Sequence, residues 1–230
     1  MRAGCAGAAL IAFFAAAAQA QAPAPEAPPA ASSAPSQAEQ LVFMREHLGA
    51  NRQPRELRYL YVADAAGQPQ VTDRAVLTLA NDASGRCCQV HGDYLSGPQT
   101  VNLPDIPDAR ANPVLLYFLE GEVRLLQRTT SGQSAHFRRR IRQALADTAT
   151  VTDSTVQWGG RTLPAKTVRI APFLDDPFRG RFEDQAGTEY SFVLADAVPG
   201  GVYAMSATVP AKTAGGGPLA RRSLTIEDAK

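Results

Sequence analysis

The change from strands to helices in the middle of the chain begins with the stretch Asn112-Pro113-Val114-Leu115-Leu116-Tyr117-Phe118-Leu119-Glu120. Asn112 before Pro113 is typical of a helix start, because an asparagine side chain caps free backbone amides and proline suits the first helical position. The first two turns after Pro113 are apolar nearly all round. This composition predicts a helix over Val114–Arg128 that is buried on more than one side.

A second helix is predicted directly after the first. Ser131-Gly132 breaks the first pattern, and apolar residues then recur at four-residue spacing up to about Ala146, at Phe137, Ile141 and Leu145. This spacing predicts one inward-facing stripe. The centre of the chain is therefore expected to form a helical hairpin.

Strand patterns lie on both sides of this hairpin, separated by turn residues. Short helical segments are expected at Gln40–Leu48 and around Pro177–Gln185, and the turn Gly159-Gly160 predicts a β-hairpin. The order of elements predicts an α+β fold, in which one curved antiparallel sheet packs on the helical hairpin. The nine expected strands are Leu57–Val62, Ala75–Leu79, Arg86–Leu95, Gln99–Leu103, Val151–Trp158, Thr162–Phe173, Glu189–Leu194, Val202–Val209 and Leu219–Ile226.

The first twenty residues have the features of a cleavable secretory signal peptide. Arg2 supplies the charged start, Ala3–Ala18 is apolar, and Ala18-Gln19-Ala20 is a small-residue cleavage site, so cleavage is expected after Ala20. A membrane anchor is the rival interpretation, but a spanning helix needs roughly 20 strongly apolar residues, whereas this stretch is mostly alanine. Cys5 has no apolar region before it, so lipidation of this cysteine is not expected.

The remaining chain divides into a linker and one domain. Residues 21–37 are built from Ala, Pro, Ser and Gln and are expected to be a disordered tether, followed by a single domain over 38–230. Without Arg2 the chain has 22 basic and 22 acidic residues, which argues against broad capture of nucleic acid. The basic residues are almost all arginine, as in GC-rich bacterial genomes. In a Gram-negative cell, an exported chain without a membrane-spanning segment would be periplasmic.

Two cysteines remain after the signal peptide, the neighbours Cys87 and Cys88. A disulfide between them is not expected, because a trans peptide holds the Cα atoms about 3.8 Å apart, below the usual disulfide range. The expected arrangement is one buried and one exposed thiol, with a redox or intermolecular role as the alternative. His91 lies about 13 Å along the strand from Cys87, so we predict no metal site there.

The densest charge cluster lies in the second helix. Arg138 and Arg142 stack four residues apart and could bind an anionic group through their guanidinium forks. The alternative is a solvated face whose arginines pair with acids such as Asp175 and Asp176. These two acids precede Pro177 and are also expected to cap the short helix that begins there. The sequence contains no Gly-x-Ser-x-Gly, Walker or His-Glu-x-x-His motif, and it predicts no catalytic residue and no cofactor.

Two parts of the chain resemble an uncharacterised exported proteobacterial protein family over most of the mature domain. These parts are Asn112–Glu120 with Phe137–Arg142, and Asp175–Pro177 with Ala197–Tyr203. The order of elements also resembles the half-barrel of the LolA and LolB type lipoprotein carriers. In those carriers a curved antiparallel sheet with helices in its mouth binds acyl chains. The second likeness is architectural, so it implies a half-barrel fold but transfers no binding residue.

These observations lead to a periplasmic binding or accessory protein that encloses an apolar, lipid-like ligand. The partner would be a lipid or a lipidated protein, with an envelope protein as a further possible partner. The alternatives are a structural or interaction protein of the envelope with a filled core, and, more remotely, a hydrolase that uses His91 or His136. The candidate residues are Tyr59, Leu115, Phe118, Leu119, Phe137 and Ile141 for an apolar cavity, and Arg138 and Arg142 for an anionic group.

Overall fold

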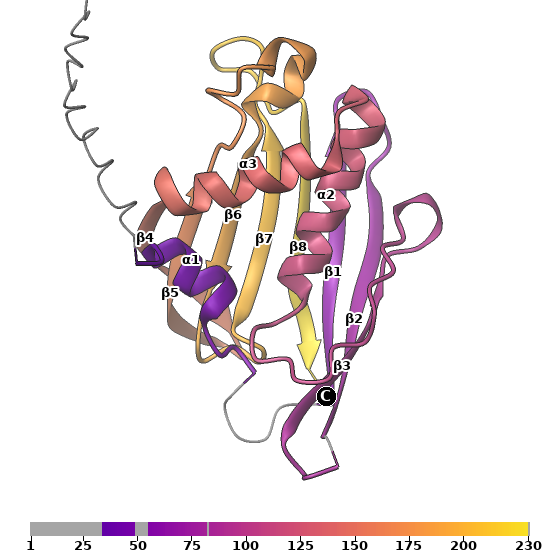
Figure 1. The fold of residues 1–230 in the computed structure, drawn as a ribbon, viewed down its shortest axis with the longest axis vertical. Coiled ribbons are helices and arrows are strands. Elements are labelled where there is room, and N and C mark those ends of the chain that lie inside the picture. The colour runs from indigo at the N-terminus through magenta and orange to yellow at the C-terminus, as the bar shows by residue number, and fades with distance from the viewer. Residues whose placement is uncertain (1–33, 49–54, 82, 230) are drawn as a thin grey trace, which may run out of the picture. The chain divides into compact units, whose positions relative to one another are not determined.

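A computed structural model describes residues 34–48, 55–81 and 83–229 (Figure 1). The predicted signal peptide, its cleavage site and residues 21–33 of the predicted linker lie outside the described residues. The first described helix, α1 (Gln37–Glu39), begins at a capping box. In this box Ser36 Oγ accepts from the Glu39 amide, and the Glu39 carboxylate accepts from the Ser36 amide.

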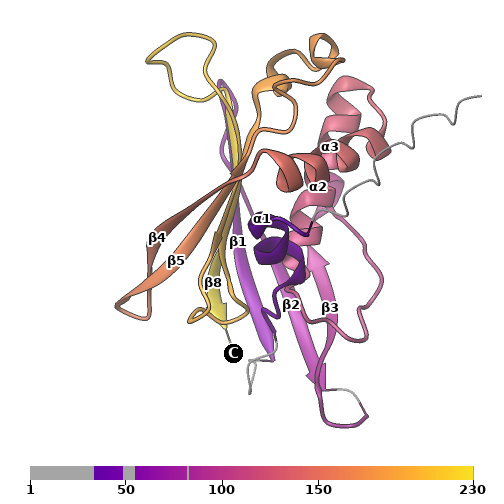
Figure 2. The same ribbon diagram turned by 60° about the vertical axis from the view of Figure 1, so that its left-hand side comes forward.

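The domain is α+β, as predicted, and its centre is one antiparallel sheet in the order β3-β2-β1-β8-β7-β6-β5-β4. The last strand pairs with the first, and this pairing joins a three-stranded meander to a five-stranded one. Figures 1 and 2 show the sheet curving around helices that all lie on one of its faces. The strands are β1 (Glu56–Ala65), β2 (Val71–Asn81), β3 (Cys87–Tyr94), β4 (Thr150–Trp158), β5 (Arg161–Ile170), β6 (Glu189–Leu194), β7 (Val202–Val209) and β8 (Ala220–Ala229).

The helical layer contains two long helices, α2 (Val114–Thr130) and α3 (Ser134–Asp147). The start of α2 is the one predicted, because Asn112 Oδ1 accepts a hydrogen bond from the Val114 amide at 3.1 Å. The helix ends where Ser131 adopts a left-handed conformation with φ 55°. Shorter helical turns are η1 (Gln40–Met44, π-helical), η2 (Gly97–Gln99), η3 (Arg179–Arg181) and η4 (Glu183–Gly187).

The predicted strand Gln99–Leu103 is wrong, so the sheet has eight described strands instead of nine. Pro98 lies inside the turn η2, and after this turn the Val101 amide donates one hydrogen bond to the Tyr94 carbonyl as the chain leaves the sheet. Val101 is buried without being in a ladder, which explains why its pattern imitated a strand. The segment returns to β3 through the bridge between Val90 and Ile106 and through a hydrogen bond from the Ala109 amide to the Cys88 carbonyl.

The prediction about the cysteines is wrong on bonding and correct on burial. Cys87 Sγ is joined to Cys88 Sγ in a disulfide. The prediction relied on the usual Cα–Cα range of disulfides, and this pair lies outside that range, with its Cα atoms 3.0 Å apart across a cis peptide. Cys88 is buried and Cys87 is exposed, as expected for neighbours at the start of a strand.

The core fills the space between the concave face of the sheet and the helices. Its largest buried side chains come from both layers, and burying each of them contributes about 1.5–3 kcal/mol. Aromatic rings meet edge to face where the start of α3 packs on the connection between β5 and β6, for example Phe137 with Phe173 at 5.7 Å between centroids. The fully buried large aromatic residues are Tyr59, Tyr117, Tyr190, Phe118, Phe137, Phe173 and Phe192.

Candidate ligand groove

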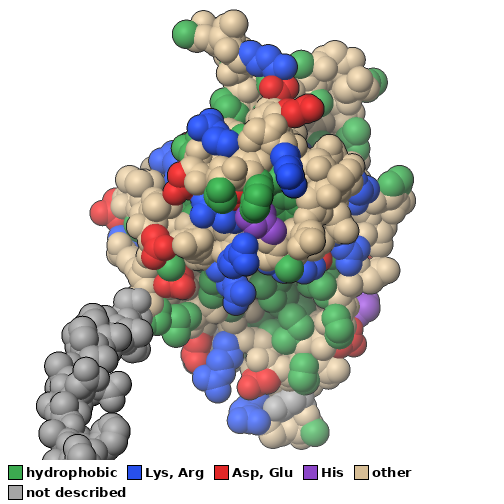
Figure 3. All heavy atoms as spheres, turned by 45° about the horizontal axis from the view of Figure 1, so that its top comes forward, with side chains coloured by type: hydrophobic (Ala, Val, Ile, Leu, Met, Phe, Trp, Pro, Cys, Tyr) green, Lys and Arg blue, Asp and Glu red, His purple; other side chains and the backbone are tan. Residues whose placement is uncertain are grey.

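An open apolar groove of about 560 Å³ lies in the helical layer, between η1, the segment after β3, α2 and α3. Its volume is in the range of known small-molecule sites. Figure 3 looks onto the face that carries the helices and shows hydrophobic side chains gathered there, bordered by Lys or Arg side chains. The lining residues are Phe43, Leu103, Leu116, Leu119, Glu120, Val123, Arg138, Ile141 and Arg142.

The groove exists because α2 is apolar on two sides. One side, which includes Leu115 and Phe118, is fully buried against the core. The other presents Leu116, Leu119 and Val123 to the groove, and Leu116 is 47% exposed. A helix buried on one side only would carry polar residues there. The all-round apolar pattern in the sequence is therefore explained by the core and the groove together.

The rim of the groove carries arginines from successive turns of α3. Arg138 forms a two-pronged ion pair with Glu120 on α2, with hydrogen bonds of 3.0 and 2.6 Å. Glu120 also lies 3.7 Å from the Arg124 guanidinium, so its charge is compensated twice. Arg142 is exposed and forms no ion pair or side-chain hydrogen bond within residues 34–48, 55–81 and 83–229. The rim is therefore net positive, with Arg142 as its open charge.

The predicted site residues divide into two groups. Four of them line the groove: Leu119, Ile141, Arg138 and Arg142. The other four are buried in the core: Tyr59, Leu115, Phe118 and Phe137. The groove also contains residues that sequence reasoning missed. Phe43 and Leu103 lie outside the hairpin, and no local pattern indicates that they pack beside it. Leu116 and Val123 belong to the apolar helix itself.

Tyr59 occupies a structural position at the foot of the helices. Its hydroxyl donates to the Val202 carbonyl at 3.3 Å and accepts from Asn112 Nδ2 at 2.9 Å. Asn112 Nδ2 also donates to the Gly200 carbonyl, and the Asn112 amide donates to His47 Nδ1 at 3.1 Å. This buried network ties the start of α2 to the sheet and to the chain after η1. It holds one end of the groove in place.

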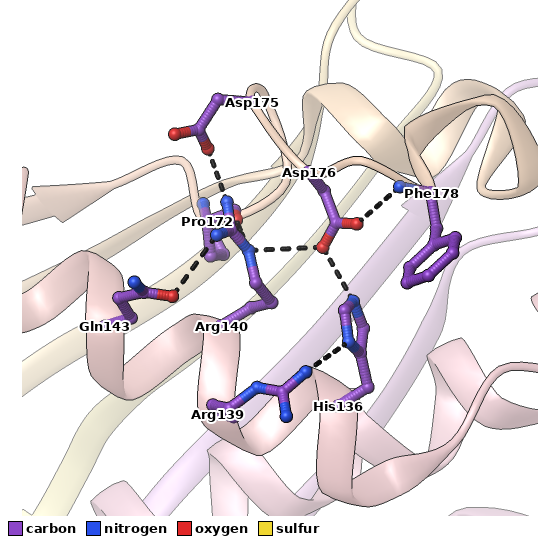
Figure 4. A network of polar contacts seen from close by, with 8 residues as sticks. All are labelled: His136, Arg139, Arg140, Gln143, Pro172, Asp175, Asp176 and Phe178. Atoms are coloured by element: carbon purple, nitrogen blue, oxygen red, sulfur yellow. Dashed lines mark hydrogen bonds and ion pairs between the residues drawn. The ribbon is translucent and has the colours of Figure 1, made fainter. Parts of the chain in front are cut away.

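A second polar network fixes α3 above the β5–β6 connection (Figure 4). The buried Asp176 carboxylate accepts from His136 Nε2 at 2.7 Å and from Arg140 Nε at 3.2 Å. Its other oxygen accepts from the Phe178 amide at 2.8 Å, in the turn before η3. The predicted helix cap is wrong, because η3 begins after Phe178 and has no side-chain cap. Arg140 also pairs with Asp175. The expected pairing of helix arginines with these acids is thus made by Arg140, not by Arg138 or Arg142.

The three histidines are each held by backbone or charged neighbours. His47 contacts the Leu41 carbonyl and the Asn112 amide, His91 contacts Asp105 and Asp93, and His136 contacts Asp176 and Arg139. None of these contacts is with a serine, threonine or cysteine side chain in the described part of the chain. The described contacts therefore contain no hydroxyl or thiol nucleophile paired with a histidine base.

Among the comparisons with known proteins, only the comparison with solved structures finds similar proteins. No protein-family model matches the chain, and no curated protein matches it. The structure is similar to lipoprotein LppX of Mycobacterium tuberculosis (10% identity, 84% of this chain and 95% of that chain, TM-score 0.36). It is also similar to LprF of Mycobacterium bovis (13%, 86% and 95%, TM-score 0.33) and to the LolA superfamily protein NE2245 of Nitrosomonas europaea (10%, 84% and 92%, TM-score 0.22).

No residue role is transferred from these three proteins to this chain. The described helices include none that is both long and apolar enough to cross a lipid bilayer.

Proposed function

We propose that this chain is an exported, periplasmic binding or accessory protein that holds an apolar chain, a lipid or a lipidated segment, in the groove between α2, α3 and η1. The observation that carries the proposal is the groove itself, where six apolar side chains surround about 560 Å³ beside two arginines. A concave pocket of this volume with a mostly apolar lining and a few charged groups is a feature of small-molecule sites. The proposal includes no catalytic step.

The rim defines the kind of ligand that fits. An acyl chain would lie against Leu116, Leu119 and Ile141, and its anionic end would reach the open guanidinium of Arg142. The guanidinium of Arg138 is already paired with the Glu120 carboxylate. Arg138 therefore connects α3 to α2 beside the groove, and Arg142 is the residue that binds the anionic end of the ligand. A single-chain amphiphile with a carboxylate or phosphate head combines both features.

The test is whether the purified chain carries or binds such a molecule. The full chain is expressed with its own leader, purified without detergent, extracted with organic solvent and analysed by mass spectrometry. We expect a co-purifying lipid in the extract and saturable binding of a fluorescent fatty acid to the stripped protein. An empty extract together with no probe binding would overturn the proposal.

A structural or interaction protein of the envelope is the second candidate, and the filled core favours it. Tyr59, Phe118 and Phe137 occupy the space between sheet and helices, so a ligand is not enclosed there. The open groove would then receive apolar side chains of a protein partner. Cross-linking in cells separates the two candidates, because a carrier should give transient partners and a structural component a stoichiometric one.

A further inference from the structure

A second, smaller pocket with a mixed lining lies on a different face of α2 from the groove. It has a volume of about 90 Å³ and lies between α2, β1, β8 and the end of β3. This is well below the roughly 300 Å³ of the smallest typical ligand pockets, so the pocket has room for a small polyatomic group and not for a drug-sized ligand. The lining residues are Tyr61, Ala63, Tyr94, Leu95, Gln99, Val101, Gly121, Glu122, Arg124, Leu125, Arg128 and Arg222.

Two tyrosine hydroxyls at this pocket have unused hydrogen-bonding capacity. Tyr61 and Tyr94 are only 5% and 4% exposed, and neither hydroxyl forms a hydrogen bond within the described residues. Neither hydroxyl is fully enclosed by protein, unlike the unpaired Tyr190 hydroxyl, so both remain open to the pocket that they line. A tyrosine buried to this degree normally has a partner for its hydroxyl. Burial raises the pKa of Tyr61 to about 12 and raises that of Tyr94 as well, so both hydroxyls keep their protons as donors at neutral pH.

The charges around the pocket favour an anion. Arg124, Arg128 and Arg222 line it with one acid, Glu122, and the Glu122 carboxylate is engaged by Arg222 through two bonds of 2.7 Å. Arg128 is exposed and makes no ion pair or hydrogen bond that involves described residues. Arg124, which also lines the pocket, donates to the Thr100 carbonyl at 3.3 Å. The lining is therefore net positive.

Gly121 keeps the pocket open. It lies inside α2, where glycine is less favourable than alanine. A Cβ at this position would meet Tyr94 Cε1 at 3.4 Å and Tyr94 Oη at 3.5 Å, which is ordinary contact. Core packing therefore does not exclude alanine here. The methyl group would instead lie beside the tyrosine hydroxyl and occupy part of the pocket.

We propose that this pocket binds a small oxyanion, a phosphate or a phosphate-bearing head, through the hydroxyls of Tyr61 and Tyr94 and the guanidinium of Arg128. Two neutral donors and a flexible cation match the tetrahedral acceptor set of a phosphate. This site is independent of the apolar groove. Its failure would leave the proposed lipid function untouched.

The test is titration of the full chain with inorganic phosphate by calorimetry. We expect saturable binding at one site. Tyr61→Phe and Tyr94→Phe, which remove only a hydroxyl, should each weaken it by at least about tenfold, as for the loss of a hydrogen bond to a charged group. Arg128→Gln should weaken binding and reduce its dependence on salt. Arg161→Gln, on β5 at the other side of the sheet, is the matched charge control and should have no effect.

Gly121→Ala gives the sharpest variant. It should weaken phosphate binding by at least about tenfold while the melting temperature stays the same or rises, because alanine favours the helix. Gly180→Ala, whose added Cβ meets nothing within 4 Å, is the matched control and should leave binding unchanged. Glycerol 3-phosphate is titrated in parallel. If it binds more tightly than inorganic phosphate, the ligand is a lipid headgroup, and if it binds more weakly, the ligand is the free ion. Absence of phosphate binding, or binding that both tyrosine variants leave unchanged, would overturn the assignment.

Discussion

Arg222 on β8 donates two hydrogen bonds of 2.7 Å to the Glu122 carboxylate on α2, and both side chains are buried. The two residues are 100 positions apart in sequence, so this pair fixes the long helix to the middle of the sheet. The Glu122 carboxylate keeps the pKa of Arg222 above its ordinary value in spite of burial. Both helix faces that line the groove and the pocket depend on this attachment.

We predict that Glu122→Leu lowers the free energy of unfolding by about 3–5 kcal/mol, because it leaves the Arg222 guanidinium buried without a counter-charge. The double variant Glu122→Leu with Arg222→Met should come within about 2 kcal/mol of the wild type, since neither charge is then buried. Urea unfolding followed by circular dichroism measures both values. A single variant that costs less than 1 kcal/mol would contradict this role.

We predict that the free energy of unfolding falls at acidic pH because His47 takes up a proton when the protein unfolds. Its Nδ1 accepts from the Asn112 amide and its Nε2 faces the Leu41 carbonyl, so the folded state requires the neutral ring. Burial lowers the pKa of His47 below its ordinary value of 6.5. The stabilisation is therefore complete above pH 6.5, falls as the pH drops below it by at most about 1.4 kcal/mol per unit, and stops falling below the folded-state pKa.

The measurement is the free energy of unfolding between pH 5 and 8 for the wild type and His47→Gln. The difference between the two proteins should be constant above about pH 7 and shrink below about pH 6.5. A difference that is the same at every pH would show that His47 does not titrate on unfolding.

The contacts of Asp176 predict a large effect of its removal. Asp176→Ala takes the acceptor from His136, Arg140 and the Phe178 amide at once. The expected loss is about 2–4 kcal/mol in the free energy of unfolding, because buried donors are left unpaired. Asp175→Ala is the matched control, since its carboxylate is exposed and its pair with Arg140 should contribute at most about 1 kcal/mol. Equal effects of the two changes would contradict the assignment.

Local patterns predicted the parts of the fold that depend on local chemistry. Asn112 before Pro113 predicted the start of α2, and Gly159-Gly160, with φ values of 56° and 72°, predicted the β4–β5 turn. The segment after Tyr94 was mispredicted because burial of Val101 imitates the alternation of a strand. Whether Val101 pairs with a neighbouring strand depends on the tertiary structure, so a local sequence pattern does not predict it.

The candidate site could be predicted only in part for the same reason. Leu119 and Ile141 lie on helix faces that periodicity identifies, but which face meets a groove depends on how α2 and α3 pack. Arg138 and Arg142 were correctly placed on one helix face. The acid that neutralises Arg138 is Glu120, eighteen residues earlier, and this pairing depends on the geometry of the hairpin. The Glu122–Arg222 pair, which depends on tertiary packing, left no trace in sequence spacing.

Arg142 should select ligands with an anionic end. We predict that Arg142→Gln weakens binding of a fluorescent fatty acid by about three- to tenfold, whereas the methyl ester of the same probe binds the variant and the wild type equally. Fluorescence titration measures both affinities, and Arg161→Gln serves as the control for net charge. Equal loss for acid and ester would remove the proposed contact between Arg142 and the ligand head.

The central claim is that the groove binds an apolar chain, and it is tested most directly by a charge placed inside it. Leu116 and Leu174 are 47% and 52% exposed, but only Leu116 lines the groove. The measurement is the affinity of a fluorescent fatty acid for Leu116→Asp and for its matched control Leu174→Asp. We predict a loss of at least about tenfold for Leu116→Asp and none for Leu174→Asp, because burying an unpaired carboxylate against an acyl chain is costly. Unchanged affinity in Leu116→Asp, with both variants folded, would contradict the claim.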